Sequence, residues 1–255
     1  MRKCLLLPLV VALVGCGWAG DSITVAAAAD LNYALTELGK RFESETGTKV
    51  VVSFGSSGNL FSQIQNGAPF DLFFSADEDY PKKLAAMGVV DAATVRTYAV
   101  GHLVLWVPAN SPLDPEKLRM ELLTRPEVAR IALANPQHAP YGRAAMATLE
   151  HYGMKDGVAR KLVYGENVSQ AAQFVQSGNA QAGLIALSLA KSPAMASSGK
   201  YWEIPSDAYP ELRQAAVVVS GSHQKKLARA FLDFVLSPEG TAILRKFGLT
   251  PPSQP

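Results

Sequence analysis

Two adjacent serines, Ser56 and Ser57, offer the clearest chemistry in the sequence, within the Gly-Ser-Ser-Gly turn at 55–58. The β-branched and aromatic run 50–54 before the turn predicts a strand, and apolar residues at helical spacing over 60–64 predict a helix after it. Ser57 is then expected to be the N-cap of this helix. The free amides and the positive end of a helix favour an anion. The alternative is an ordinary serine-capped helix with nothing bound.

Three further turns carry candidate polar groups. Asp30 follows the unbroken apolar run 23–29 and is a candidate cap for a helix that ends at Thr46-Gly47. The turn at 135–142 presents the phenol of Tyr141 at a helix start, although Tyr141 could equally pack in the core. The turn at 165–169 is another strand-to-helix turn that offers backbone amides, again with or without a ligand.

Enzymatic and metal chemistry are poorly supported. The turn at 55–58 does not fit the G-x-S-x-G nucleophile elbow, because Asn59 stands where the last glycine should be. A serine hydrolase using Ser57 would need a nearby base, and no recognisable hydrolase context surrounds the histidines, which are His102, His138, His151 and His223. The acidic cluster at 77–79 could suggest a cation site, but acidic residues at a helix start match the helix dipole without any metal. A binding protein is therefore favoured over an enzyme.

The elements that must position these turns read as two α/β units. Strands and helices alternate in both units, which predicts parallel sheets with ligands outside the carboxyl ends of the strands. The run 98–108 is too long for one buried strand and could pass between two lobes. The preferred architecture has two lobes joined by two or more extended crossings: lobe I is 21–101 plus 212–255, and lobe II is 102–211. The predicted strands are 23–29, 49–54, 70–75, 130–134, 161–165, 183–187 and 215–219.

The N-terminus has the features of a secretory signal peptide over 1–20, with a basic start and an apolar run too short to span a bilayer. Leu13-Val14-Gly15-Cys16 resembles a bacterial lipobox, which would make Cys16 a lipidated first residue; the alternative is ordinary cleavage after Ala19. The only other cysteine, Cys4, would be removed, so the exported chain has no disulfide. Without Arg2 and Lys3 the chain carries 22 basic and 22 acidic side chains, which gives no support for nucleic-acid or direct membrane binding.

The sequence as a whole resembles the periplasmic molybdate-binding proteins, the substrate-binding subunits of molybdate ABC importers. The matching stretches are collinear and cover nearly the whole exported chain. They are 23–31, 53–58, 67–77, 136–142, 166–168 and 246–249. The resemblance implies a two-lobed periplasmic-binding-protein fold of type II, an α/β fold in which each lobe has a mostly parallel sheet flanked by helices. It also implies a protein that closes on a tetrahedral oxyanion, with molybdate or tungstate as the ligand.

The resemblance also implies site residues. Ser57 matches a serine that donates through its hydroxyl and amide, and Val168 matches a residue that donates through its amide. Tyr141 falls where some members have tyrosine, whereas others have a small residue there and a tyrosine at the position of Ala186. Asp30 departs from the family, which usually has serine or threonine at its position. A carboxylate here has three explanations: it caps its own helix and points away from the anion, it is protonated, or the protein binds a different ligand. The helix cap is favoured. Asn32 and Asn59 are secondary candidates.

The expected function is capture of a molybdate or tungstate ion in the periplasm or another extracytoplasmic space, by a monomer that delivers it to an ABC transporter permease. No cofactor and no free metal cation are expected, because molybdenum would enter only as the bound oxyanion. The membrane would be contacted only through a lipid on Cys16. Two alternatives remain: a binding protein for sulfate, phosphate or a small organic anion, and a serine hydrolase.

Overall fold

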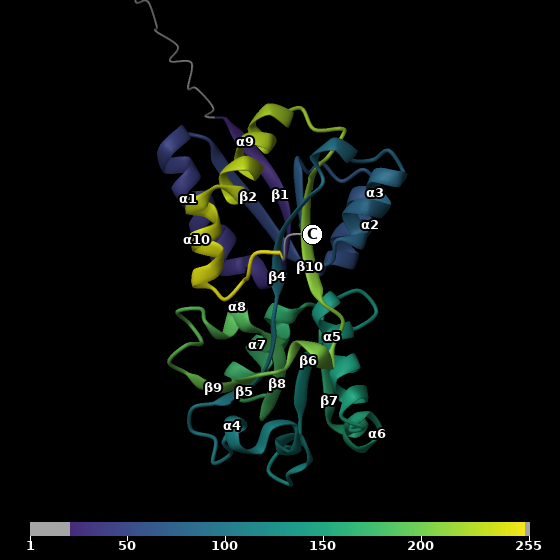
Figure 1. The fold of residues 1–255 in the computed structure, drawn as a ribbon, viewed down its shortest axis with the longest axis vertical. Coiled ribbons are helices and arrows are strands. Elements are labelled where there is room, and N and C mark those ends of the chain that lie inside the picture. Colours follow the sequence, from purple (N-terminus) through teal and green to yellow (C-terminus); the bar gives the residue numbers. More distant parts are fainter. Residues whose placement is uncertain (1–20, 253–255) are drawn as a thin grey trace, which may run out of the picture.

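A computed structural model describes residues 21–252 of the protein, so the predicted signal peptide and Cys16 lie outside the described residues. The described chain forms two lobes, one above the other, each built on one five-stranded sheet (Figure 1). Both sheets have helices on their faces, which confirms the two-lobed α/β fold expected from the sequence. No helix within 21–252 combines the length and the apolar character needed to cross a membrane.

The sheet of the upper lobe has the strand order β2-β1-β3-β10-β4. Its strands are β1 (Ser22–Ala28), β2 (Lys49–Gly55), β3 (Leu72–Ser75), β4 (Arg96–Gly101) and β10 (Leu212–Val218). The first three pair in parallel, and β10 runs antiparallel to both of its neighbours. The helices are α1 (Asn32–Thr46), α2 (Ser57–Gln65), α3 (Asp79–Ala86), α9 (Lys225–Leu236) and α10 (Pro238–Lys246). Apolar residues of α1, α9 and α10 form one core cluster, and those of α2 and α3 form a second.

The sheet of the lower lobe repeats this arrangement with the order β7-β6-β8-β5-β9. Its strands are β5 (Leu103–Pro108), β6 (Ile131–Ala134), β7 (Leu162–Gly165), β8 (Ala182–Ala186) and β9 (Gly199–Glu203). Here β5 is the strand that runs antiparallel to both neighbours. The helices are α4 (Pro115–Leu118), α5 (Pro140–His151), α6 (Lys155–Val158), α7 (Val168–Gln176) and α8 (Leu187–Ala190).

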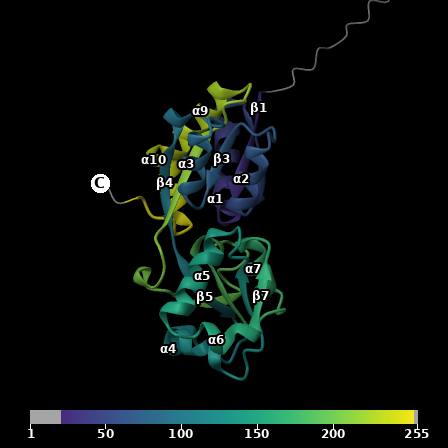
Figure 2. The ribbon, with the colours of Figure 1, turned by 90° about the vertical axis from the view of Figure 1, so that its right-hand side faces the viewer.

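Two extended segments cross between the lobes. The first leads from β4, which ends at Gly101, into β5, and the second leads from β9 into β10, which begins at Leu212. Figure 2 shows both on the same side of the molecule. The run 98–108 is therefore two strands in two sheets, as its length suggested. The reversed strands β5 and β10 were not predicted, because alternation of strands and helices points to parallel pairing only.

The segment after α10 is held in place near its start. Thr250 exchanges two backbone hydrogen bonds with Val100 at 2.8 and 3.0 Å. Its hydroxyl also lies 2.9 Å from Nε2 of His102. The chain beyond α10 is thus tied to the first crossing.

Candidate functional site

A small cavity lies between the two lobes, with an empty volume of about 190 Å³. The upper lobe contributes the ends of β1 and β2 and the start of α2, and the lower lobe contributes the starts of α5 and α7. All four primary candidates line it. The lining residues are Ala28, Ala29, Asp30, Gly55, Ser56, Ser57, Ala76, Ala139, Pro140, Tyr141, Asn167 and Val168. No lysine, arginine or histidine stands among these described residues, so any anion bound here meets neutral donors.

Ser57 is the first residue of α2 and is fully buried. Its Oγ accepts a hydrogen bond from the amide of Ala76 at 2.9 Å. The prediction that Ser57 is the N-cap is wrong: Ser56 holds the cap position, and neither serine makes a side-chain cap bond. Because the Ser57 oxygen accepts from Ala76, its own proton remains available for a ligand in the cavity.

Asp30 lies in a 3₁₀ turn over Ala29–Leu31, and its side chain does not cap a helix. The predicted cap is therefore wrong; the N-cap of α1 is Leu31. The Asp30 carboxyl is instead buried, with Oδ2 accepting from Gln214 Nε2 at 2.7 Å and from the Tyr141 hydroxyl at 3.2 Å. The tertiary partners pull the side chain inward, away from the amides of its own helix. Burial raises the pKa of Asp30 and the two hydrogen bonds lower it. Burial has the larger effect, so the pKa is about 6.

Tyr141 reaches the Asp30 carboxyl from the start of α5 in the lower lobe. Burial, and then the neighbouring Asp30 carboxyl, hold the pKa of its phenol well above the ordinary value, so it remains a neutral hydroxyl. The close approach depends on Gly101, where a Cβ atom would come within 2.2 Å of the Tyr141 hydroxyl. The phenol is thus placed in the site, with Asp30 as its nearest acceptor.

Gln214 and Tyr98 complete this arrangement, and sequence reasoning missed both. Gln214 is fully buried on β10, and its Oε1 accepts from the Tyr98 hydroxyl at 2.7 Å. That bond orients the Gln214 amide so that its NH₂ faces Asp30. The only sequence signal was a polar residue directly before the apolar run 215–219, which does not reveal a partner far away in the chain.

Val168 begins α7, and the Asn167 side chain before it caps the helix. Asn167 Oδ1 accepts from the amides of Ser169 and Gln170, both at 3.0 Å. The starts of α2, α5 and α7 therefore all face one cavity. Each brings partial positive charge at its first amides, which suits an anion.

The two secondary candidates do not line the cavity. Asn32 is the first residue of α1, and its carbonyl accepts from the Thr36 hydroxyl at 2.6 Å. Asn59 Nδ2 donates to Glu166 Oε1 across the lobes at 2.6 Å. Asn59 therefore belongs to the contact between the lobes.

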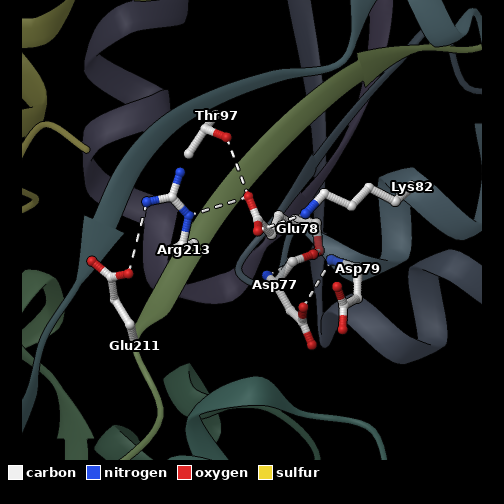
Figure 3. Close-up of polar contacts among 8 residues, drawn as sticks. Asp77, Glu78, Asp79, Lys82, Thr97, Glu211 and Arg213 are labelled. Atoms are coloured by element: carbon white, nitrogen blue, oxygen red, sulfur yellow. Dashed lines mark hydrogen bonds and ion pairs between the residues drawn. The ribbon is translucent and has the colours of Figure 1, made fainter. Parts of the chain in front are cut away.

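Two of the three carboxylates in the acidic cluster at 77–79 pair with protein donors, and Figure 3 shows these contacts for Glu78 and Asp77. Glu78 pairs with Lys82 at 2.6 Å and with Arg213 at 3.3 Å. Asp77 pairs with Arg143 of the other lobe and also accepts from the amide of Asp79. Within 21–252 no group of three or more histidine, cysteine or acidic side chains is arranged to hold a metal ion.

A histidine does approach the serine turn, but it pairs with Ser56 and not with Ser57. His138 Nδ1 lies 2.8 Å from Ser56 Oγ. Its other nitrogen lies 3.6 Å from Glu166, whose side chain is 61% exposed. That distance is beyond a hydrogen bond, so Glu166 does not fix the imidazole as a hydrolase triad requires. The Ser56–His138 pair instead joins the lobes, next to the bond from the Gly58 amide to the His138 carbonyl at 2.9 Å.

Two lobes with two crossings, closing on a buried cavity lined by neutral donors from both sides, define a solute-binding protein. The model of the family of bacterial extracellular solute-binding proteins matches residues 23–250. Molybdate-binding protein ModA of Azotobacter vinelandii is 36% identical over 236 residues, covering 92% of each chain. A putative ABC transporter substrate-binding lipoprotein of Bacillus subtilis is 33% identical, covering 90% of this chain and 86% of its own.

Solved structures agree with the sequence comparison. The periplasmic molybdate-binding protein of Azotobacter vinelandii superposes with a TM-score of 0.85 at 35% identity, covering 91% of this chain and all of its own. The chain therefore belongs to the bacterial extracellular solute-binding proteins and, within them, to the group of the molybdate-binding relatives. This confirms the resemblance seen in the sequence. Members of this family are binding proteins of ABC transporters and not enzymes, which removes the hydrolase alternative.

Proposed function

We propose that this protein captures molybdate, and tungstate equally well, as a fully ionised tetrahedral oxyanion in the cavity between its lobes. The observation that carries the proposal is the cavity wall, where the Ser57 hydroxyl and three helix starts converge and no cationic side chain is present. Neutral donors spread the charge of a dianion over many hydrogen bonds, each worth roughly 1.5–3 kcal/mol with a charged acceptor.

Each of the four primary candidates has a role in this proposal. Ser57 donates its hydroxyl and Val168 its backbone amide, one from each lobe. Tyr141 and Asp30 form the inner wall, with the phenol held by the carboxyl. The two lobes, 21–101 with 212–252 and 102–211 among the described residues, move as units, so the hinges lie between β4 and β5 and just before β10. Closure excludes water and presents a new surface to the permease of an ABC importer, to which a monomer of this protein delivers the ion.

Calorimetric titration with molybdate, tungstate, sulfate and phosphate tests the proposal. Molybdate and tungstate should bind with similar affinity, and sulfate, being smaller, should bind more weakly because the donors are too far apart to reach it. Ser57→Ala should weaken molybdate binding by roughly 1.5–3 kcal/mol through loss of one charge-assisted donor. Ser62→Ala is the matched control, since Ser62 lies on the same helix and bonds only the Gly58 carbonyl.

Other results would contradict this assignment. Preference for sulfate or phosphate over molybdate would assign the cavity to another anion. An unchanged dissociation constant in Ser57→Ala would remove Ser57 from the site.

A lipid on Cys16 anchors the protein to the outer face of a bacterial membrane in this proposal. The support is the Leu-Val-Gly-Cys sequence at 13–16 and the relative described as a putative lipoprotein. Expressed in a bacterium, the wild-type chain should fractionate with membranes and Cys16→Ser should remain in the soluble fraction. A soluble wild-type product that begins at Gly20 would establish ordinary cleavage instead.

A further inference from the structure

The two oxygens of the Asp30 carboxyl have different surroundings. Oδ2 accepts hydrogen bonds from Gln214 on β10 and Tyr141 on α5. Oδ1 is equally buried but has no hydrogen-bonding partner among the described residues. Asp30 as a residue lines the cavity and is 1% exposed. A buried polar atom without a hydrogen-bonding partner is rare in native proteins, so Oδ1 is expected to bond to a ligand in the cavity.

The groups that face Asp30 are neutral. They are Gln214 from β10, Tyr141 from α5 and, behind Gln214, Tyr98 from β4. Ser188 from α8 donates to the Asp30 carbonyl at 2.7 Å. Burial and the Asp30 charge keep the pKa values of Tyr98 and Tyr141 well above the ordinary value, so neither phenol ionises. No described cation therefore compensates a negative charge on Asp30.

An ionised Asp30 and an oxyanion repel each other in this cavity. The Asp30 carboxyl is buried and the side chains bonded to it are uncharged, so the repulsion is only weakly screened. A neutral carboxyl avoids it. Because Oδ2 already accepts two hydrogen bonds, the proton belongs on Oδ1, where it becomes a donor. Burial, partly offset by the hydrogen bonds from Gln214 and Tyr141, already raises the pKa of Asp30 to about 6, and a bound dianion raises that pKa further.

We infer that Asp30 takes up one proton from solvent with each oxyanion that binds, and that the resulting Oδ1–H group donates a hydrogen bond to the anion. No bond of the anion breaks, and the site gains one proton and one dianion together. This inference rests on the proposed oxyanion function and adds to it the protonation state of the complex. It makes Asp30 a specificity-determining residue, because a protonated Oδ1 favours a ligand whose oxygens all accept hydrogen bonds and carry no proton.

The inference sets the pH dependence of binding. Where free Asp30 is ionised and bound Asp30 is protonated, the affinity falls about tenfold for each unit of rising pH. Between about pH 6.5 and 8.5 the dissociation constant of molybdate should therefore increase between about 50-fold and 100-fold. Molybdate is fully ionised throughout this range, so its own titration does not contribute.

Calorimetry in buffers of different ionisation enthalpy measures the proton directly. The wild-type protein should take up close to one proton per molybdate at about pH 8. Asp30→Asn is the matched variant: its amide oxygen replaces Oδ2 toward Gln214 and Tyr141, and its NH₂ replaces the protonated Oδ1. This variant should take up no proton and bind with pH-independent affinity, more tightly than wild type at about pH 8. Thermal unfolding of both proteins shows that the variant is folded.

The outcomes separate the inference from the function on which it rests. Wild-type binding without proton uptake and without pH dependence overturns the inference and leaves the oxyanion function intact. A folded Asp30→Asn that no longer binds molybdate also overturns it, because the NH₂ of the asparagine can donate just as the protonated carboxyl is inferred to do. No binding of molybdate by wild type at any pH overturns both.

Discussion

Two of the contacts between the lobes differ chiefly in burial. The inner contact consists of Asp30, Gln214 and Tyr141, none of which is more than 2% exposed. The rim contact consists of the pairs Asp77–Arg143 and Asn59–Glu166, and the Arg143 and Glu166 side chains are 41% and 61% exposed. The inner contact has one titratable carboxyl and no cation, whereas the rim has one partly exposed ion pair and one hydrogen bond to an exposed carboxylate. Desolvation therefore dominates inside, and screening limits what the rim contributes.

The largest expected effect concerns the inner contact and its pH dependence. The pKa of Asp30 rises from 3.8 to about 6 on folding, so the folded state binds more protons than the unfolded state between these values. Stability from this group is complete below the unfolded pKa and falls as pH rises through the folded pKa, by roughly 3 kcal/mol in total. Relative to wild type, Asp30→Asn should thus gain roughly 2.4 kcal/mol between pH 4 and pH 7, because an unfolded Asp30 is already more than half ionised at pH 4.

Chemical denaturation of wild type and Asp30→Asn at several pH values measures this difference. The comparison between the two proteins cancels the other titrating groups, which are common to both. A difference that does not change with pH would mean that Asp30 titrates normally, and the contrast between inner contact and rim would lose its basis.

The second effect is steric and breaks the inner contact without changing any charge. A Cβ atom at Gly101 would lie 2.2 Å from the Tyr141 hydroxyl and 2.7 Å from Gln214 Nε2. Gly101→Ala should therefore displace these side chains and cost roughly 1–3 kcal/mol of unfolding free energy. Gly157→Ala is the control, because nothing lies within 4 Å of its Cβ position. Equal unfolding midpoints for the two variants would show that the inner contact tolerates displacement.

The smallest effect is expected at the rim. Arg143 binds Asp77 across the lobes, and a partly exposed pair of this kind is worth about 0.2–1 kcal/mol. Arg143→Gln should weaken molybdate binding by up to about fivefold at low salt, because the closed form loses one contact. The difference should disappear at high salt.

Arg41→Gln is the matched control for the rim, since Arg41 pairs with Glu239 within one lobe and should not affect closure. The distinction between closing contacts and ordinary surface pairs would fail in two cases. The first is a loss of molybdate affinity in Arg143→Gln that does not depend on salt, and the second is an equal loss of affinity in Arg41→Gln. The titrations use the same molybdate concentrations for all three proteins.

Most of the framework was predictable from local patterns. The unbroken apolar run 23–29 marked β1, the β-branched and aromatic run 50–54 marked β2, and helical spacing over 60–64 marked α2. The turns at 55–58, 135–142 and 165–169 were also recognisable, because the residues that form a strand-to-helix turn are neighbours in the sequence. All four primary candidates lie around one cavity, although their roles as ligand donors stay a prediction.

The role of Asp30 was decided by the tertiary structure. A short polar residue at a helix start is a reasonable cap by local rules, yet Asp30 binds Tyr141 and Gln214, which are 111 and 184 residues away in the chain. The reversed strand β10 brings Gln214 to it, and the glycine at 101 leaves room for the phenol. The sequence by itself determined the elements and the turns that carry the donors, because those depend on neighbouring residues. Which group faces which, and therefore the protonation of the buried carboxyl, depends on burial and on partners that only the folded chain brings together.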